Sequence, residues 1–236
     1  MKKRTISTYI IALLTLSSAL VFPAGVQAQN VSAPKGEESQ EKVPFYQGVQ
    51  VGVDVAGLMS KAFGSDAFVT ELGIEVNLQN RFFPVLEVGY GGLDTTNEET
   101  GIYYKTSAPF FRVGVGYNVF YKKPHLPGRM TVGVRYGFSS FEYDLQAPDL
   151  VDPNWGHTSV PFVYEGMKTN AGWLEVVLGM KTNVFKDFYM GFDVRYRSRM
   201  SMTKHENSEP YYIPGYGRGK PSNFGITYNL TYKLPF

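Results

Sequence analysis

The chain ends in the stretch NFGITYNLTYKLPF, residues 223–236, in which every second residue from Phe224 to Phe236 is apolar or aromatic. The residues between them are mostly small or polar, as at Gly225 and Thr227. A period of two places successive side chains on opposite faces of a β-strand. One face of this strand is therefore apolar. It meets either a protein core or membrane hydrocarbon, because a soluble sheet and a membrane barrel give the same alternation.

The same alternation recurs in seven further stretches of the chain. These stretches cover residues 48–55, 70–78, 86–91, 111–119, 132–139, 174–181 and 190–197. Together with the terminal stretch they predict eight strands of about ten residues, the length that a tilted strand needs to cross a membrane. The 17 Tyr, 17 Phe and 25 Gly residues, with little helical periodicity, also indicate an all-β chain.

The polar face of these strands carries many glycines, which weaken a strand on an ordinary water-facing surface. Glycine fits the narrow interior of an eight-stranded barrel, where side chains share little space. The opposite face is a band of Val, Leu, Ile, Phe and Tyr. We therefore predict an eight-stranded antiparallel up-and-down transmembrane β-barrel. A ten-stranded barrel is the alternative if residues 159–165 add a hairpin, and a soluble, lipocalin-like barrel would reverse the two faces.

The connections between the predicted strands alternate between short and long. Three short connections cover residues 80–82, 121–129 and 186–187, and four longer ones cover residues 60–66, 93–105, 146–169 and 203–221. Outer-membrane barrels have short periplasmic turns and longer extracellular loops. The rhythm therefore predicts that both termini are periplasmic and that the long loops face outward.

Charged residues of both signs share the glycine-rich face. Burial of one such charge alone costs several kcal/mol, so we expect them to form pairs. An interior that is just wide enough for side chains favours a salt-bridge plug over a selective ion path, which is the alternative. The predicted lumen charge network is Asp54, Glu71, Glu75, Glu87, Arg112, Arg135, Glu175, Lys181, Asp193, Arg195 and Arg197.

The N-terminus has the form of a secretory signal peptide. A basic segment at residues 2–4 precedes a mostly apolar run at 9–22, and Val26-Gln27-Ala28 is a small-residue cleavage site. The apolar run is shorter than the roughly 20 residues that span a bilayer. We therefore predict export and cleavage after Ala28. The expected organisation is a signal peptide (1–28), a flexible periplasmic tether (29–43) and an outer-membrane barrel (44–236).

Composition excludes several functions. The chain has 23 Lys and Arg against 21 Asp and Glu, and loss of the three basic residues of the leader leaves 20 against 21. A nearly neutral chain gives no electrostatic reason to expect nucleic acid as a partner. The absence of cysteine excludes disulfides and thiolate chemistry.

The candidate catalytic and metal-binding residues lie in predicted loops. Ser201, His205 and Glu209 could serve a lipid-modifying enzyme, but nearness in a loop does not place a base beside a nucleophile. The spacing of Asp149, Asp152, Asn154 and His157 does not match a calcium loop. We therefore predict no catalytic residue, no metal and no cofactor.

Aromatic residues gather at the predicted outer rim, where rings commonly form an interfacial girdle. Tyr211, Tyr212 and Tyr216 lie in the middle of a long loop and are the exceptions. These three are the candidates for stacking on a surface glycan or binding a protein partner.

The terminal strand ends in alternating aromatic and apolar residues, at Tyr228, Leu230, Tyr232, Leu234 and Phe236. This pattern resembles the signal by which bacterial outer-membrane barrels are recognised for assembly, which implies the barrel-assembly machinery and outer-membrane lipid as partners. The stretches FYMGFDVRYRSRMS, YYIPGYG and FGITYNLTYKL are also similar to a family of Bacteroidetes outer-membrane proteins that carries a domain-of-unknown-function label. The resemblance implies the compartment and adds no activity.

The sequence thus predicts a monomeric outer-membrane barrel of structural or surface-recognition type, which acts through its extracellular loops and is not an enzyme. A lipid-modifying enzyme and a narrow pore are the alternatives.

Overall fold

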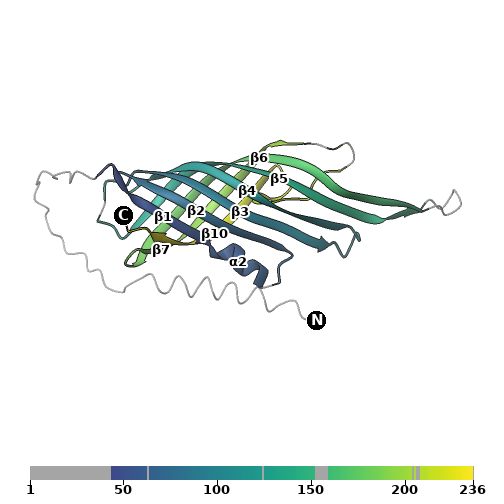
Figure 1. The fold of residues 1–236 in the computed structure, drawn as a ribbon, viewed down its shortest axis with the longest axis horizontal. Coiled ribbons are helices and arrows are strands. Elements are labelled where there is room, and N and C mark those ends of the chain that lie inside the picture. Colours follow the sequence, from purple (N-terminus) through teal and green to yellow (C-terminus); the bar gives the residue numbers. More distant parts are fainter. Residues whose placement is uncertain are drawn as a thin grey trace, which may run out of the picture. The chain divides into compact units, whose positions relative to one another are not determined.

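Eight long strands close into one antiparallel barrel, as Figure 1 shows. The strands follow each other around the barrel in the order β1-β10-β7-β6-β5-β4-β3-β2. The computed structural model of the protein describes residues 44–62, 64–123, 125–151, 159–203, 205 and 208–235. The long strands are β1 (Tyr46–Asp54), β2 (Ala67–Leu78), β3 (Phe82–Thr96), β4 (Tyr103–Asn118), β5 (Gly128–Val151), β6 (Ser159–Phe185), β7 (Phe188–Met202) and β10 (Ser222–Lys233).

The predicted fold class and the predicted number of barrel strands are confirmed. The ten-stranded alternative is wrong, because residues 159–165 belong to β6 and extend its pairing with β5. Two short strands, β8 (Tyr212–Ile213) and β9 (Gly217–Arg218), pair with each other in a separate small sheet.

Short and long connections close opposite ends of the barrel. The short-turn end carries residues 79–81, 119–127 and 186–187. The long-loop end carries the connections that follow β1, β3, β5 and β7. Strand pairing continues further toward this end than predicted, since β3 and β4 pair as far as Thr96 and Tyr103. β5 and β6 run past the neighbouring strands in Figure 1. Much of the predicted loop sequence is therefore strand.

The first strand ends early, and a helix that the sequence did not predict follows it. α2 (Val55–Ala62) begins where Val55 was expected to continue the strand. Asp54 Oδ1 accepts hydrogen bonds from the backbone N–H of Ala56 (3.0 Å) and of Tyr228 (3.2 Å), so it caps the helix and holds its start against β10. None of the described residues forms a helix long and apolar enough to span a membrane.

α2 lies where β1 no longer pairs with its neighbours. The pairing of β1 stops at Val53 opposite Leu72 of β2 and at Asp54 opposite Asn229 of β10. Residues 67–71 and 222–228 therefore have no β1 partner, and α2 packs against both of these strands. Because a helix satisfies its own backbone hydrogen bonds, it can fill a gap in the wall at which a strand has stopped.

The outward face of the barrel is an apolar belt. Along β5 the belt runs from Met130 to Phe138, and it ends where Ser140 and Glu142 take the outward positions. Many of its side chains are about half exposed, which is uncommon for large apolar groups in a protein that meets only water. Belt residues include Leu72, Ile74, Leu86, Val88, Val113, Val115, Val132, Val134, Val176, Leu178, Phe192, Val194, Ile226 and Leu230.

The interior is filled by side chains of three kinds. An apolar cluster that includes Tyr104, Phe110, Phe141 and Trp173 fills the long-loop half, charged residues fill the middle, and a polar cavity lies at the short-turn end. Inward-facing glycines make room for the large rings, as predicted. A Cβ atom at Gly137 would stand 2.2 Å from the indole of Trp173.

Candidate functional site

Two arginines and three glutamates form the centre of the charged layer. Arg112 Nη1 lies 2.5 Å from Glu71 and 3.1 Å from Glu87, and its Nε lies 2.8 Å from Glu175. Arg195 contacts the same three carboxylates at 3.0, 3.0 and 3.7 Å. Both arginine side chains are 1% exposed, so these charges interact with one another and hardly with solvent.

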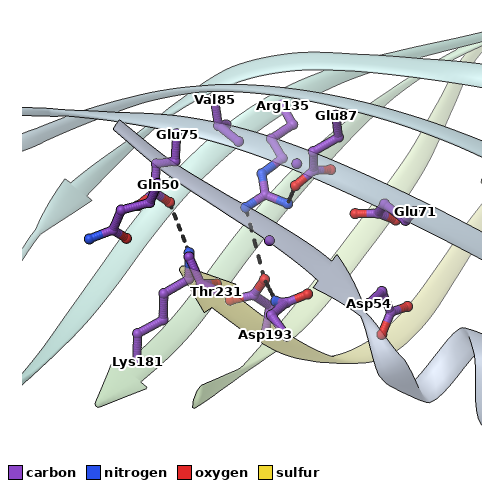
Figure 2. Close-up of a pocket in the computed structure, with 13 residues that line it drawn as sticks. Gln50, Asp54, Glu71, Glu75, Val85, Glu87, Arg135, Lys181, Asp193 and Thr231 are labelled. Carbon is purple, nitrogen blue, oxygen red and sulfur yellow. Dashed lines mark hydrogen bonds and ion pairs between the residues drawn. The ribbon is translucent and has the colours of Figure 1, made fainter. Parts of the chain in front are cut away.

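Two further cations extend this centre. Arg135 bonds to Glu87 and lies 3.9 Å from Asp193, whose carboxylate also accepts a 2.7 Å hydrogen bond from Asn229. Figure 2 shows Arg135 between Glu87 and Asp193 inside the barrel. Arg197 Nε lies 3.3 Å from Glu175.

A second group of ion pairs lies nearer the short-turn end. Glu75 pairs with Arg129 and, at 3.1 Å, with Lys181. Arg129 also donates a 3.0 Å hydrogen bond to Gln50, and its guanidinium carbon stands 4.0 Å from the ring centre of Phe83. Arg129 is missing from the predicted network because it was assigned to a turn. The alternation along β5 continues inward from residue 135 to residue 129, so this signal could have found it.

Strand register explains why opposite charges meet. Glu87 on β3 stands directly opposite Arg112 on β4, and Glu175 on β6 stands opposite Arg135 on one side and Arg197 on the other. Side chains in such cross-strand positions are close enough to interact. The register of the β3–β4, β5–β6 and β6–β7 pairs therefore places opposite charges side by side.

Asp54 differs from the other members of the predicted network. It is 4% exposed and lines the same small cavity as Glu71, but its described bonds are to the backbone of Ala56 and Tyr228. In Figure 2 it lies apart from the ion pairs, beside the end of β1. Its carboxylate serves as a helix cap and not as part of the salt-bridge plug.

A loop closes the lumen above the charges. Residues 211–219, here called the plug loop, contain the β8–β9 hairpin. The carbonyl oxygens of Gly215 and Tyr216 accept hydrogen bonds from Arg112 (2.7 Å) and Arg197 (3.0 Å). Tyr104 donates a 2.9 Å hydrogen bond to the carbonyl of Tyr212. The plug loop therefore supplies backbone acceptors to arginines that the carboxylates satisfy only in part.

Gly215 lets the plug loop approach this closely. Its φ of +78° lies in the left-handed region that glycine adopts readily, and a Cβ atom there would stand 2.4 Å from the ring of Phe110. Tyr216 packs edge-on against Trp173, with ring centres 5.7 Å apart. The loop is thus packed into the apolar cluster as well as bonded to the charges.

This packing corrects part of the recognition hypothesis. Tyr212 is 7% and Tyr216 0% exposed, so neither ring is free to stack on a ligand. Tyr211 is 51% exposed, so of the three rings it is the one that a ligand can reach. The sequence could not separate the three, because the plug loop folds inward through contacts with β4 and β6 that are distant in sequence.

Tyr211 borders a cavity of about 600 Å³ at the long-loop end, here called the outer cleft. Its walls come from the β3–β4 hairpin and from residues 209–220. Arg218 and Lys220 supply positive charge, and Glu209 supplies a carboxylate. The other lining residues are Thr95, Asn97, Thr100, Ile102, Tyr104, Leu145, Pro210 and Gly219.

The candidate catalytic residues are not assembled into a triad. His205 Nε2 forms a 2.8 Å hydrogen bond with the backbone carbonyl of Lys168, and its ring meets Tyr143. Ser201 is exposed on β7, and Glu209 lines the outer cleft. Within the described part of the chain, no group of three or more His, Asp or Glu side chains is arranged to hold a metal. Asp152, Asn154 and His157 lie outside the described residues, and so does the side chain of Asp149.

The predicted assembly signal lies at the end of β10. Tyr228, Leu230 and Tyr232 are exposed members of the apolar belt, with Leu234 just beyond the strand. Phe236 lies outside the described residues, as do the predicted signal peptide and tether.

The chain matches one family along nearly its whole length, over residues 6–236. It belongs to the family described as "Domain of unknown function (DUF6048)". A search of curated proteins gives no match.

Solved structures give weaker likenesses. A major outer membrane protein from Thermus thermophilus aligns with 79% of this chain and 97% of its own, at 13% identity and a TM-score of 0.46. Neisserial surface protein A aligns with 79% of this chain and 96% of its own, at 12% identity and a TM-score of 0.38.

Proposed function

We propose that the protein is a monomeric outer-membrane β-barrel of structural or surface-recognition type, not an enzyme, with a sealed lumen and with its binding surface at the long-loop end. The apolar belt supports the membrane assignment. On β5 it spans nine residues from Met130 to Phe138, which agrees with the nine to eleven residues of a tilted transmembrane strand. Export with cleavage after Ala28, and recognition of the final strand by the assembly machinery, belong to the same proposal.

The buried ion-pair network across the lumen is the observation that carries the proposal. Arg112 contacts carboxylates from β2, β3 and β6 and also the plug loop, so one side chain ties together four parts of the interior. The cavity among the ion pairs is only about 30 Å³. A second cavity, of about 280 Å³, borders the charged layer at Glu71 and Arg197, between α2 and the plug loop. A continuous ion path would need this layer to open, so function at the barrel's outer surface is favoured over a pore.

The outer cleft has the chemistry of a saccharide site. Tyr211 offers an exposed ring for stacking on a sugar face, and Arg218 and Lys220 can bind acidic substituents. On the opposite wall, the oxygen of Asn97 accepts from the backbone of Glu99 and Thr100, which leaves its NH₂ group to donate to a ligand. We infer an anionic surface glycan as the ligand class.

The test is binding of acidic and neutral oligosaccharides to the protein folded in detergent micelles. Tyr211→Ala and Arg218→Gln each should weaken binding of an acidic saccharide about tenfold, which corresponds to the loss of one good contact. Lys105→Gln is the matched control, because Lys105 lies at the same end but outside the cleft, in an exposed pair with Asp94.

Equal binding by wild type, Tyr211→Ala and Arg218→Gln would exclude the cleft. A protein ligand captured through the same two residues, without saccharide binding, would contradict the glycan class. The membrane assignment is tested separately: a mature chain that stays monomeric and soluble without detergent would overturn it.

A further inference from the structure

A polar cavity of about 220 Å³ lies at the short-turn end, opposite to the plug loop. Turn residues Asn80, Lys123 and Pro127 line it on the outside, and Arg129 and Lys181 form its inner wall. Since one water molecule occupies roughly 30 Å³ in the liquid, the cavity has room for a small solute. It is separate from the outer cleft and takes no part in the function proposed above. We call it the short-turn cavity.

The charged residues that line it are all positive. Lys123, Arg129, Lys181 and Lys233 line the cavity, and no carboxylate is among the described residues that do. Glu75 lies beneath the inner wall and pairs with Arg129 and Lys181. Among the described residues no ion pair joins Lys123 or Lys233 to a carboxylate. A concave site lined by one sign of charge concentrates counter-ions.

The uncharged groups of the lining add hydrogen-bond donors. The side-chain oxygen of Gln50 accepts from Arg129, and that of Gln47 accepts from Asn77. An amide whose oxygen is already bonded still has its NH₂ group to offer. Within the described part of the chain these two NH₂ groups have no partner. Tyr189, whose hydroxyl is a further possible donor, also lines the cavity.

Two of the other amides in the lining, those of Asn118 and Asn183, serve the fold. Asn118 donates to the carbonyl of Asn80, and its own oxygen accepts from the backbone of Phe120. Asn183 donates to the carbonyl of Lys186. These bonds hold the turns at the wall of the cavity.

We propose that the short-turn cavity binds a small oxyanion, with Lys123 and Lys233 as the cations that contact it and with Gln47, Gln50 and Tyr189 as neutral donors. Carboxylate and phosphate groups share the needed chemistry, since both accept several charge-assisted hydrogen bonds. Arg129 and Lys181 lie in the inner wall and act on the anion through their charge, without contacting it. They are held by Glu75, and their remaining positive charge favours an anion over a neutral solute.

The experiment uses the full mature chain folded in detergent micelles. Isothermal titration calorimetry measures binding of inorganic phosphate and of N-acetylalanine, a simple carboxylate, at one fixed ionic strength. The double variant Lys123→Gln/Lys233→Gln should weaken binding of the favoured anion about tenfold or more, because it removes two charged donors.

The matched control is Lys122→Gln/Lys186→Gln, which removes the same charge at the same end. Lys122 stands over Tyr121 and Lys186 beside Phe185, and neither lines the cavity. We expect this control to bind the anion as wild type does.

Tighter binding of phosphate than of N-acetylalanine assigns the site to phosphate groups, and the reverse assigns it to carboxylates. The proposal is overturned if wild type binds neither anion, or if the two double variants lose affinity equally. Equal losses would show that only the overall charge of this end matters. Failure of saccharide binding at the outer cleft would leave this proposal untouched.

Discussion

Glu175 shows how much a single charge contributes to the closed interior. It is fully buried and contacts Arg112, Arg195 and Arg197, and it accepts a 2.7 Å hydrogen bond from Trp173. Glu175→Gln keeps the shape but removes the charge that these cations share. Loss of one partner from a buried ionic group costs about 3–5 kcal/mol, so we expect a destabilisation of that size in urea unfolding of the micelle-bound protein.

The control for this variant is Glu142→Gln. Glu142 pairs with Lys168 at 3.3 Å, but the two side chains are 59% and 80% exposed. Exposed pairs contribute at most about 1 kcal/mol, so this variant should unfold nearly as wild type does. Equal destabilisation by the two substitutions would contradict the view that burial makes the network strong.

Gly215 allows a test of how the plug loop is seated. In Gly215→Ala the new Cβ atom would collide with Phe110, in addition to the strain of a positive φ. We expect the plug loop to leave the lumen and trypsin to cleave after Arg218 much faster than in wild type. Gly217→Ala separates strain from collision, because Gly217 lies in the same loop with a φ of +107°, but a Cβ atom there would come no closer than 3.4 Å to Asn223. Similar cleavage rates in the two variants would show that strain alone matters.

Individual residues were predictable where they follow the strand alternation. Glu87, Arg112 and Arg195 lie on the glycine-rich face, and their inward direction follows from a period of two. Asp54 sits on the same face, yet its role as a cap depends on the helix that follows it. Periodicity thus predicts the direction of a side chain but not its partner.

At the scale of elements, α2 is the feature that alternation missed. Val51, Val53 and Val55 continue one pattern, but the chain leaves the sheet at Val55, where Asp54 caps a helix. The plug loop was missed for a related reason. Its fold depends on Arg112 and Phe110 of β4, about a hundred residues earlier, and a local pattern does not contain that information.

The seating of α2 on β2 can be tested at Gly57. A Cβ atom there would stand 2.3 Å from the carbonyl oxygen of Val69, a backbone atom that has little room to move. Gly57→Val should therefore lift the helix and increase hydrogen exchange of α2 several-fold, while β5 and β6 stay protected.

Leu58→Val is the control for the helix, because Leu58 is 47% exposed and the same β-branched residue replaces it. If both variants raise exchange equally, lower helix propensity and not the close contact would be the cause.

For the whole molecule, the sealed lumen predicts that the barrel conducts no ions. Wild type in planar bilayers should show no steady conductance, because the charged layer and the plug loop close the interior in series. Removal of residues 211–219 alone should leave it closed. Combining that removal with Glu87→Ala and Arg112→Ala, which deletes one ion pair without changing net charge, should open a path. Steady conductance of wild type would refute the sealed-lumen proposal.

The assignment of the apolar belt to lipid has the widest consequences for the whole molecule, and β5 offers a direct test of it. Val134 is half exposed in the middle of the belt, whereas Ser140 faces the same way just beyond its edge. An arginine on the lipid face costs about 2–4 kcal/mol at the bilayer midplane and about 0–1 near the interface. Val134→Arg should therefore fold into lipid vesicles much less completely than Ser140→Arg, as measured by resistance to protease. On a water-facing surface both arginines would be tolerated alike, so equal folding of the two variants would exclude hydrocarbon around the belt.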